Sequence, residues 1–293
     1  MRYIKFIVYF FFGMLWFVSC EDEPVDWEAE DAPSKLVVEG TFTNEKKHHR
    51  VRLTQSADYF SNQRTPPVSG AQVAITGGDS TFLFAENSDE PGVYETVREV
   101  AGIPGNAYKL DIQLPEPVNG TVTYYAEEMM LQGIDVDSIT PMVYENPFSA
   151  DDDFVDSLIL TIDILGSEPR DIDNFYRVDL YINGNLETDT IDEVQVFSDE
   201  EEFSNAYSNS LAFFKSVQPQ DTVGIQVSSV SEDYAYFLEG VQNITNQSGS
   251  PFDLSGPPAN AAGNIQGGDA LGYFRVSYVS SASAIAMDMR EKD

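Results

Sequence analysis

The stretch "KLVVEGTFTNEKKHHRVRLTQS", residues 35–56, indicates the fold class of the whole chain. Its two ends, 35–43 and 49–56, are rich in β-branched and apolar residues, and the polar segment "NEKKH" lies between them. Two β-rich runs joined by a short polar turn are typical of a β-hairpin. The stretch therefore predicts that the folded part of the chain begins with a pair of antiparallel strands.

Further short β-rich segments follow, and no helical periodicity interrupts them. The first two, 71–76 and 81–86, predict a second hairpin across Gly77-Gly78-Asp79. Turns rich in proline and glycine recur about every 8 to 12 residues, which is the spacing of an antiparallel β-sandwich. We therefore expect a first β-sandwich domain over residues 35–133. Its remaining candidate strands are residues 92–97, 107–114 and 121–128.

A second series of strand candidates begins after Gly133 and predicts another β-sandwich, over residues 134–293. In "YRVDLYI" the apolar residues alternate, so they are expected to share one face of a strand. Residues 232–245 instead place apolar side chains at helical spacing, with Ser231 as the N-cap. We expect a helix near 232–246 whose aromatic stripe packs in the core rather than forming a ligand platform. The alternating residues are Tyr176, Val178, Leu180 and Ile182.

The overall charge of the 293-residue chain excludes some functions. Its formal net charge is −33, and such a field repels nucleic acids and anionic membrane surfaces. Hydrophobic residues make up 42% of the chain, which argues against general disorder. The single cysteine excludes an internal disulfide.

The N-terminal segment is typical of an export signal. Arg2 and Lys5 precede a 13-residue apolar run at 6–18, which is shorter than the ~20 residues of a membrane-spanning helix. The following Val18-Ser19-Cys20 resembles the lipobox of bacterial lipoproteins, although Phe17 stands where leucine is common. The resemblance implies cleavage after residue 19, acylation of Cys20 by palmitate and similar chains, and anchoring in a lipid bilayer. The alternatives are a catalytic thiol or an ordinary small apolar residue.

Residues 20–34, "CEDEPVDWEAEDAPS", contain seven acids and two prolines and predict an extended tether. Glu21, Asp22 and Glu23 resemble the acidic export signal of surface-exposed lipoproteins in the Bacteroidota. The alternative is an ordinary soluble linker, whose acidic residues only keep it solvated. The resemblance implies a lipid-anchored protein of the outer membrane that faces the cell surface.

Several segments resemble known families. "PPVSGAQVAI", "PGVYET" and "IPGNAYKLDI" are similar to sandwiches of the prealbumin or carboxypeptidase-regulatory type, and the second domain is expected to be Ig-like. Together with "KLVVEGTFTN", "NFYRVDLYING" and "PPANAAGNIQGGDALGYF", they resemble the Bacteroidota lipoproteins known as domain of unknown function 4249. The likeness covers roughly residues 20–280. It implies an outer-membrane lipoprotein that cooperates with a TonB-dependent receptor, and it carries over no catalytic activity.

The segment 257–274, "PPANAAGNIQGGDALGYF", is the predicted contact surface for a transporter or ligand. Its small residues and paired glycines allow a close backbone approach, and its last two aromatic residues are suited to exposure. The alternative is a long loop that packs across the sandwich. The candidate contact residues are Asn260, Asn264, Gly267, Gly268, Tyr273 and Phe274.

"KKHHR", residues 46–50, is the one basic cluster in the acidic chain. It is interpreted as a solvated hairpin tip, with contact to an anion as the alternative. His48 and His49 are consecutive, so in a strand they point to opposite faces and do not form a two-histidine metal site.

The acidic runs at 151–156 and 199–203 offer oxygen ligands for bound calcium, but neither has the spacing of an EF-hand loop. No other cofactor is predicted. Five Asp-Ser or Asp-Thr tripeptides resemble O-glycosylation sites of exported Bacteroidota proteins, and they are equally typical of turns at strand entries. They begin at Asp79, Asp137, Asp156, Asp189 and Asp221.

Three functions remain open. The leading hypothesis is a non-enzymatic outer-membrane lipoprotein that assists a TonB-dependent receptor as a ligand-capturing or structural subunit. The second is a free-standing surface module that binds a glycan or a peptide. The third is a hydrolase with two carboxylates about 5 to 10 Å apart. The sequence contains no G-x-S-x-G motif and no metal triad that would favour the third.

Overall fold

The computed structural model describes residues 33–57, 65–146, 158–167, 175–198, 206–213, 215, 217–246 and 260–290. Residues Ser34–Asp293 form one compact unit, distinct from Met1–Pro33. Cys20, the predicted signal, most of the predicted tether and both candidate calcium runs lie outside the described residues. Among the described residues, no helix combines the length and apolarity that crossing a membrane requires.

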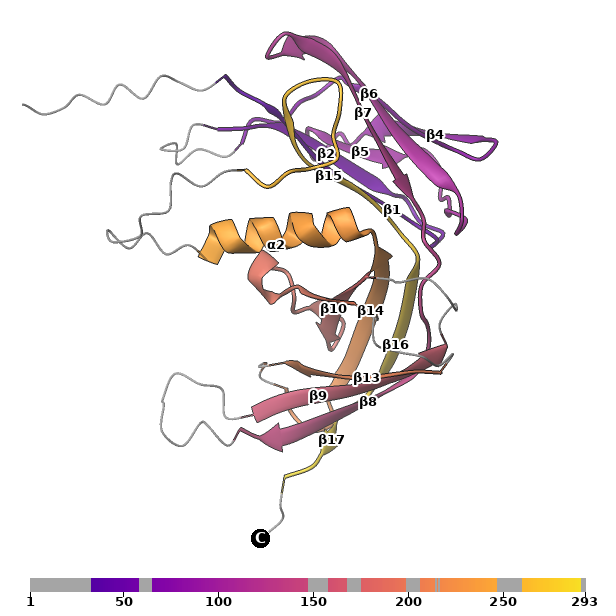
Figure 1. Ribbon diagram of the computed structural model, residues 1–293, viewed down its shortest axis with the longest axis vertical. Coiled ribbons are helices and arrows are strands. Elements are labelled where there is room, and N and C mark those ends of the chain that lie inside the picture. The colour runs from indigo at the N-terminus through magenta and orange to yellow at the C-terminus, as the bar shows by residue number, and fades with distance from the viewer. Residues whose placement is uncertain are drawn as a thin grey trace, which may run out of the picture. The chain divides into compact units, whose positions relative to one another are not determined.

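The fold is all-β and sandwich-like, as the sequence predicts (Figure 1). The first sheet has eight strands that surround one hydrophobic cluster. In sheet order they are β15 (Ala270–Ser277), β1 (Leu36–Thr43), β2 (Arg50–Gln55), β5 (Val93–Thr96), β4 (Ser80–Glu86), β3 (Gln72–Gly77), β6 (Ala107–Val118) and β7 (Thr121–Met129).

Two further sheets share a second hydrophobic cluster. The five-stranded sheet contains β11 (Asn185–Leu186), β10 (Phe175–Ile182), β14 (Thr222–Val230) and β16 (Val279–Ile285), with β12 (Gln195–Ser198) paired to β10. The four-stranded sheet has the order β13 (Ala206–Phe213), β9 (Leu158–Ser167), β8 (Asp135–Glu145) and β17 (Met287–Asp288). The alternation predicted for β10 is confirmed, because Tyr176, Val178, Leu180 and Ile182 all lie in this cluster.

Both predicted hairpins are confirmed. β1 pairs with β2 in antiparallel register, with Leu36 opposite Gln55, and β3 pairs with β4, with Gly77 opposite Ser80. Alternation along β1 buries Leu36 and Val38 and directs the residues between them to the other face. The first sheet therefore has one face in its core and one face available for other elements.

The C-terminal strands are divided between two sheets. Residues 271–280 resemble one continuous strand, but the chain leaves the first sheet after Ser277 and enters the five-stranded sheet at Val279. The Asn44 side chain holds this switch, because its Nδ2 donates to Val279 O at 3.1 Å and its Oδ1 accepts from Val279 N at 2.7 Å. The backbone N–H of Tyr278 donates to Ser229 Oγ at 3.0 Å.

The same strands qualify the predicted domain division. The two clusters divide the chain between Met130 and Ile134, close to the expected boundary after residue 133. However, β15 runs parallel to β1, and its Phe274 and Val276 belong to the first cluster. A segment expected in the second sandwich therefore completes the first one, and the pairing there is parallel rather than antiparallel.

The segment before β15 joins the two edges of the eight-stranded sheet. Gln266 and Tyr125 of edge strand β7 exchange backbone hydrogen bonds of 2.7 and 3.0 Å. Gly267 has φ +105°, and a Cβ there would lie 2.4 Å from the Thr123 carbonyl oxygen. The segment therefore covers an otherwise open edge, which protects it from pairing with another chain.

The predicted helix is α2 (Glu232–Asn246), and the short 3₁₀ helix η2 (Ile191–Glu193) packs near it. Ser231 caps α2, because its Oγ accepts a hydrogen bond from the backbone N–H of Tyr234 at 3.3 Å. Tyr234 and Leu238 pack with Val230 and with Tyr273 of β15 in a third small cluster. The helix thus lies against the outer face of β15 (Figure 1).

We predict that Gly267→Ala lowers the free energy of unfolding by about 3 kcal/mol or more, because a methyl group there collides with the β7 backbone. Gly120→Ala is the matched control, since Gly120 also has a positive φ but a Cβ added there would meet no atom within 4 Å. The control carries only left-handed backbone strain of about 1 to 2 kcal/mol. Urea unfolding followed by circular dichroism measures both, and equal losses would contradict the proposed contact.

Candidate functional site

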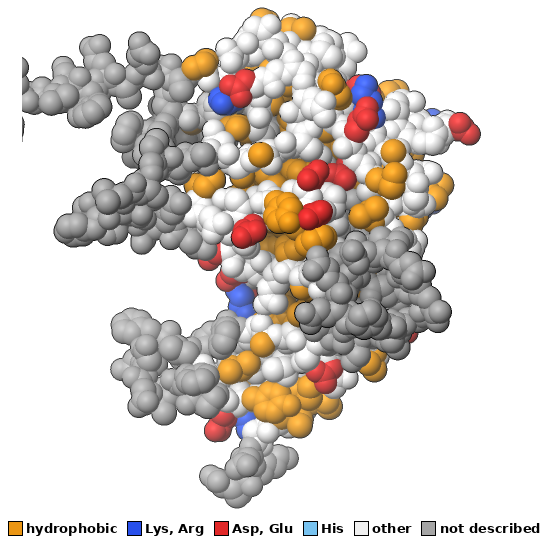
Figure 2. All heavy atoms as spheres, in the orientation of Figure 1, with side chains coloured by type: hydrophobic (Ala, Val, Ile, Leu, Met, Phe, Trp, Pro, Cys, Tyr) orange, Lys and Arg blue, Asp and Glu red, His pale blue; other side chains and the backbone are white. Residues whose placement is uncertain are grey.

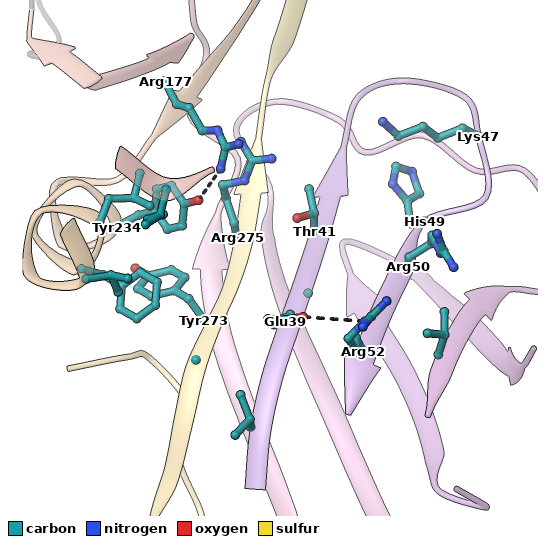
Figure 3. A pocket seen from close by; sticks show the side chains of 18 of the residues that line it. Glu39, Thr41, Lys47, His49, Arg50, Arg52, Arg177, Tyr234, Tyr273 and Arg275 are labelled. Carbon is teal, nitrogen blue, oxygen red and sulfur yellow. Dashed lines mark hydrogen bonds and ion pairs between the residues drawn. The ribbon is translucent and has the colours of Figure 1, made fainter. Parts of the chain in front are cut away.

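A pocket of about 790 Å³ lies on the outer face of the first sheet, where α2 covers part of it (Figure 3). Its floor comes from β1, β2 and β15, whose alternate side chains face away from the core. One wall comes from α2 and η2, and β10 contributes a single residue, Arg177. The volume is typical of pockets for small ligands.

Strand register sets the order of side chains on the floor. Neighbouring strands lie about 4.8 Å apart, so residues in register form rows across the sheet. The structure contains two such rows within the pocket lining, one ending at a β15 arginine and one at a β15 tyrosine. The rows are Arg275–Thr41–Arg50 and Tyr273–Glu39–Arg52.

The wall formed by the helices is apolar. Tyr234 and Leu238 are buried, whereas Ile191, Phe237 and Val241 are half-buried and border the cavity. The helical stripe predicted from sequence therefore serves both as core and as pocket wall. An apolar or aromatic part of a ligand would be desolvated against it.

Positive charge gathers at this pocket. Five of the chain's sixteen lysines and arginines line it, together with both histidines, and Glu39 is the one acidic residue of the lining. By contrast, the face in Figure 2 carries scattered acidic side chains and few basic ones. The five cations are Lys47, Arg50, Arg52, Arg177 and Arg275.

Three of these cations form surface ion pairs. Lys47 pairs with Glu45, Arg50 pairs with Glu90 and with Glu95, and Arg52 lies 3.8 Å from Glu39. Exposed pairs of this kind contribute at most about 1 kcal/mol each. These pairs therefore balance charge at the pocket rim, but they do not hold the three basic side chains rigidly.

Arg177 is fixed more firmly. Its Nε and Nη2 donate to Asp179 Oδ1 at 3.0 and 2.7 Å, and its Nη1 donates to the Tyr234 hydroxyl at 3.0 Å. Burial alone would lower the pKa of Arg177, but Tyr234 and Asp179 raise it above the ordinary value. The buried Asp179 neutralises this guanidinium.

Arg275 has no such partner. Within the part of the chain that the structure describes, its side chain makes no hydrogen bond or ion pair, and its Nη1 is buried. Its guanidinium lies over the Tyr234 ring, with Cζ 5.6 Å from the ring centroid. Burial lowers the pKa of Arg275, as expected for a charge withdrawn from water.

The basic cluster at 46–50 reaches the pocket, since Lys47, His48, His49 and Arg50 all line it. His48 is exposed and His49 is buried, as expected for consecutive residues in an extended segment. The His48 Nδ1 lies 2.6 Å from Thr96 O and the His49 Nε2 lies 2.9 Å from Val100 O. Since carbonyl oxygens only accept, both ring nitrogens are donors.

The structure distributes the predicted contact residues among different roles. Asn264 pairs with the backbone of Phe274, as its Nδ2 donates to Phe274 O at 2.8 Å and its Oδ1 accepts from Phe274 N at 2.9 Å. Gly267 and Gly268 pack against β7. Asn260 is exposed and lies outside the pocket lining.

The two aromatic residues of that prediction separate. Tyr273 is 6% exposed, so it is buried rather than exposed as expected, but it lines the pocket. Phe274 is fully buried in the first core, so its expected exposure is wrong. Successive residues of a strand face opposite sides, which explains why only Tyr273 reaches the pocket.

Tyr273 also belongs to a polar network beside the pocket. Its hydroxyl donates to Glu128 Oε2 at 2.9 Å, and Ser231 Oγ donates to the same oxygen at 3.3 Å. Asn264 Nδ2 lies 3.4 Å from it. Burial raises the pKa of Glu128 above its ordinary value, and the bonds from Tyr273 and Ser231 oppose this shift. The network joins β7, β15 and the start of α2.

Sequence reasoning missed Arg177 and Arg275. Their positions in the sequence offer one signal. Each is a cation at a polar position of a segment in which apolar residues alternate, "YRVDLYI" or "GYFRVS". Each therefore lies on the strand face opposite the core. What the sequence did not provide was the pairing of β15 with β1, which brings Arg275 beside Thr41.

Among the described residues, no group of three or more histidines, cysteines, aspartates or glutamates is arranged to hold a metal ion. The predicted calcium runs fall outside them. Of the tripeptides that resemble O-glycosylation sites, the one beginning at Asp156 is only partly described. These predictions stay predictions.

Comparison with known proteins identifies one family. The family model described as "Domain of unknown function (DUF4249)" matches residues 22–283. No curated protein matches the chain. Among solved structures, a chain titled "Cytokine receptor complex - Crystal form 1A" matches with 8% identity and a TM-score of 0.24, covering 69% of this chain and 86% of that one.

We predict a pH-dependent gain in stability for Glu128→Gln. The folded-state pKa of Glu128 is raised, so the folded state keeps a proton that the unfolded state has released. Its contribution to the free energy of unfolding therefore falls as pH rises from the unfolded pKa of about 4.3 through the folded pKa. Relative to the wild type, Glu128→Gln should gain stability across that window, by roughly 1 kcal/mol.

Urea denaturation at a series of pH values measures this gain. The matched control is Glu127→Gln, which removes a carboxylate from the exposed side of the same strand. An equal pH dependence in the two variants would attribute the effect to net charge and contradict the role of burial at Glu128.

Proposed function

Because this chain belongs to the family described as "Domain of unknown function (DUF4249)", whose description assigns no activity, we propose its function from the pocket: it is a non-enzymatic, membrane-anchored ligand-binding protein. The supporting observation is the cavity of about 790 Å³ that combines an apolar helical wall with a cationic floor. Convergent polar groups beside an apolar wall are typical of small-ligand sites.

The composition of the pocket favours binding over hydrolysis. Glycoside hydrolysis requires two carboxyl groups on either side of a bond. Among the lining residues Glu39 is the one carboxylate, and it lies 3.8 Å from Arg52. Glu128, whose pKa is raised by burial, is engaged by Tyr273 and Ser231 and is not part of the lining.

The proposed location is the outer membrane. The apolar run at 6–18 and Val18-Ser19-Cys20 support cleavage before Cys20 and its acylation. Several acyl chains at one cysteine anchor a protein firmly, since each buried methylene contributes about 0.8 kcal/mol. The acidic residues that follow support a tether and exposure at the cell surface.

The proposed partner is a TonB-dependent receptor, to which the protein delivers a captured ligand. The resemblance of the chain to lipoproteins that cooperate with such receptors supports this assignment. A free-standing binding module is the alternative, and the same pocket would serve it. The two functions differ in whether the protein works as part of a receptor complex.

We predict that Cys20→Ala abolishes lipid attachment. Without the thiol no acyl chain is added, so the protein should no longer incorporate labelled palmitate and should leave the outer-membrane fraction. The measurement is metabolic labelling followed by membrane fractionation. Ser19→Ala is the control, because it keeps a small residue before the cysteine and should be labelled normally. Labelled Cys20→Ala protein would refute the anchor.

We also predict that the protein co-purifies with a TonB-dependent receptor from membranes solubilised in mild detergent. Chemical cross-linking before solubilisation, followed by mass spectrometry, identifies the partner. If the protein always migrates alone and no receptor cross-links to it, the partnership is wrong. Ligand binding by the protein without a receptor would then favour the free-standing module.

A further inference from the structure

Arg275 is a cation that lacks a counter-ion in a partly buried place. A guanidinium has five N–H donors, and a buried charge without a partner is strongly unfavourable. Among the described residues Arg275 lies over the face of the Tyr234 ring, and the charges of Asp179 and Glu45 act on it without forming an ion pair. Its Nη1 is buried with no acceptor among them. This arrangement is expected of a group whose partner is a ligand.

Tyr234 offers a second donor at the same place. Its hydroxyl oxygen accepts a hydrogen bond from Arg177 at 3.0 Å, so its own proton remains to be donated. Figure 3 shows Arg177 and Arg275 side by side next to Tyr234 at one end of the pocket. An acceptor bound there would meet the Tyr234 hydroxyl and the Arg275 guanidinium together.

The local charge balance indicates how much negative charge fits. Asp179 neutralises Arg177, and the other lining cations, Lys47, Arg50 and Arg52, have carboxylate partners. Arg50 has two such partners, Glu90 and Glu95, so Arg275 is the one lining cation that forms no ion pair with a described residue. A carboxylate brings one negative charge to this one guanidinium, whereas a phosphate monoester carries about −1.5 to −2 at neutral pH, which exceeds the charge of Arg275.

The opposite wall indicates the rest of the ligand. Ile191, Phe237 and Val241 are half-buried and border the cavity, so they provide apolar surface that a ligand would cover. Burial of that surface is favourable in proportion to its area. The pocket therefore combines a site for one anionic group with a surface for an apolar one.

Resting on the ligand-binding function proposed above, we propose that the pocket binds an apolar monocarboxylate. The ligand's carboxylate accepts hydrogen bonds from Arg275 and from the Tyr234 hydroxyl, and its apolar group packs against Phe237 and Val241. Arg177 is a positioning residue, because it holds the Tyr234 hydroxyl so that its proton points to the ligand.

Calorimetric titration of the mature, acylated protein in detergent tests the proposal with three probes. N-acetyl-L-phenylalanine carries the carboxylate, N-acetyl-L-phenylalaninamide is its uncharged counterpart, and phenyl phosphate carries the larger charge. We expect the acid to bind at least about tenfold more tightly than the amide and than phenyl phosphate, as charge-assisted hydrogen bonds are about twice as strong as neutral ones.

Arg275→Gln should weaken binding of the acid at least about tenfold and leave binding of the amide unchanged. Arg98→Gln is the matched control, because it removes the same charge from an exposed residue outside the pocket lining and should preserve the preference for the acid. Equal weakening in both variants would overturn the proposal, as would tighter binding of phenyl phosphate or no binding of the acid.

A measurement without ligand separates a binding role from a structural one. Arg275→Met should unfold at the same temperature as the wild type or at a higher one, because it removes an unpaired buried charge. A clear decrease would mean that Arg275 stabilises the fold, and the proposal would be wrong. Equal affinity for the acid and the amide would overturn the monocarboxylate proposal and leave the proposed ligand-binding function standing. The proposed function itself fails if protein purified from membranes carries neither a receptor nor a bound ligand.

Discussion

The structure depends on one stretch of chain, from β15 through β16, that belongs to two sheets. β15 pairs in parallel with β1 in the first sheet, and β16 pairs with β14 in the five-stranded sheet. A chain that leaves one sheet for another must satisfy its backbone groups at the switch. Asn44 does this with two hydrogen bonds to Val279. The connection therefore ties both hydrophobic clusters to one continuous segment.

Asparagine performs the same task a second time at Asn264. There the side chain provides one donor and one acceptor to Phe274, as a neighbouring strand would. The backbone of Gln266 then pairs with β7, and Gly267 allows the close approach. Together these contacts place β15 in the one register that sets Arg275 beside Thr41 and Tyr273 beside Glu39. The floor of the pocket is thus a consequence of how the sheet edges are joined.

Local sequence patterns predicted the elements but not their long-range partners. The hairpins at 35–56 and 71–86 were predictable, because their strands are adjacent in sequence and their turns are polar or glycine-rich. Helix α2 was predictable from its apolar spacing and from Ser231. The parallel pairing of β1 with β15 joins residues more than 200 positions apart, and β-propensity carries no information about such a pairing. Phe274 is expected on the surface because residues 257–274 are interpreted as a contact loop, whereas in a strand its alternation with Arg275 places it in the core.

The acidity of the chain and the cations of its pocket act over different ranges. At physiological ionic strength, charges more than about 8 Å apart are largely screened, so the net charge of −33 affects mainly the approach of a charged ligand. Once a ligand is in the pocket, the nearest charged groups determine its electrostatic energy. One of them is Arg275, which has no carboxylate partner among the described residues. Raising the salt concentration therefore weakens the long-range repulsion while leaving a partly buried contact less affected. For the ligand binding that we propose, the net charge would disfavour strongly charged anions, and an apolar group on the ligand would add to the binding free energy.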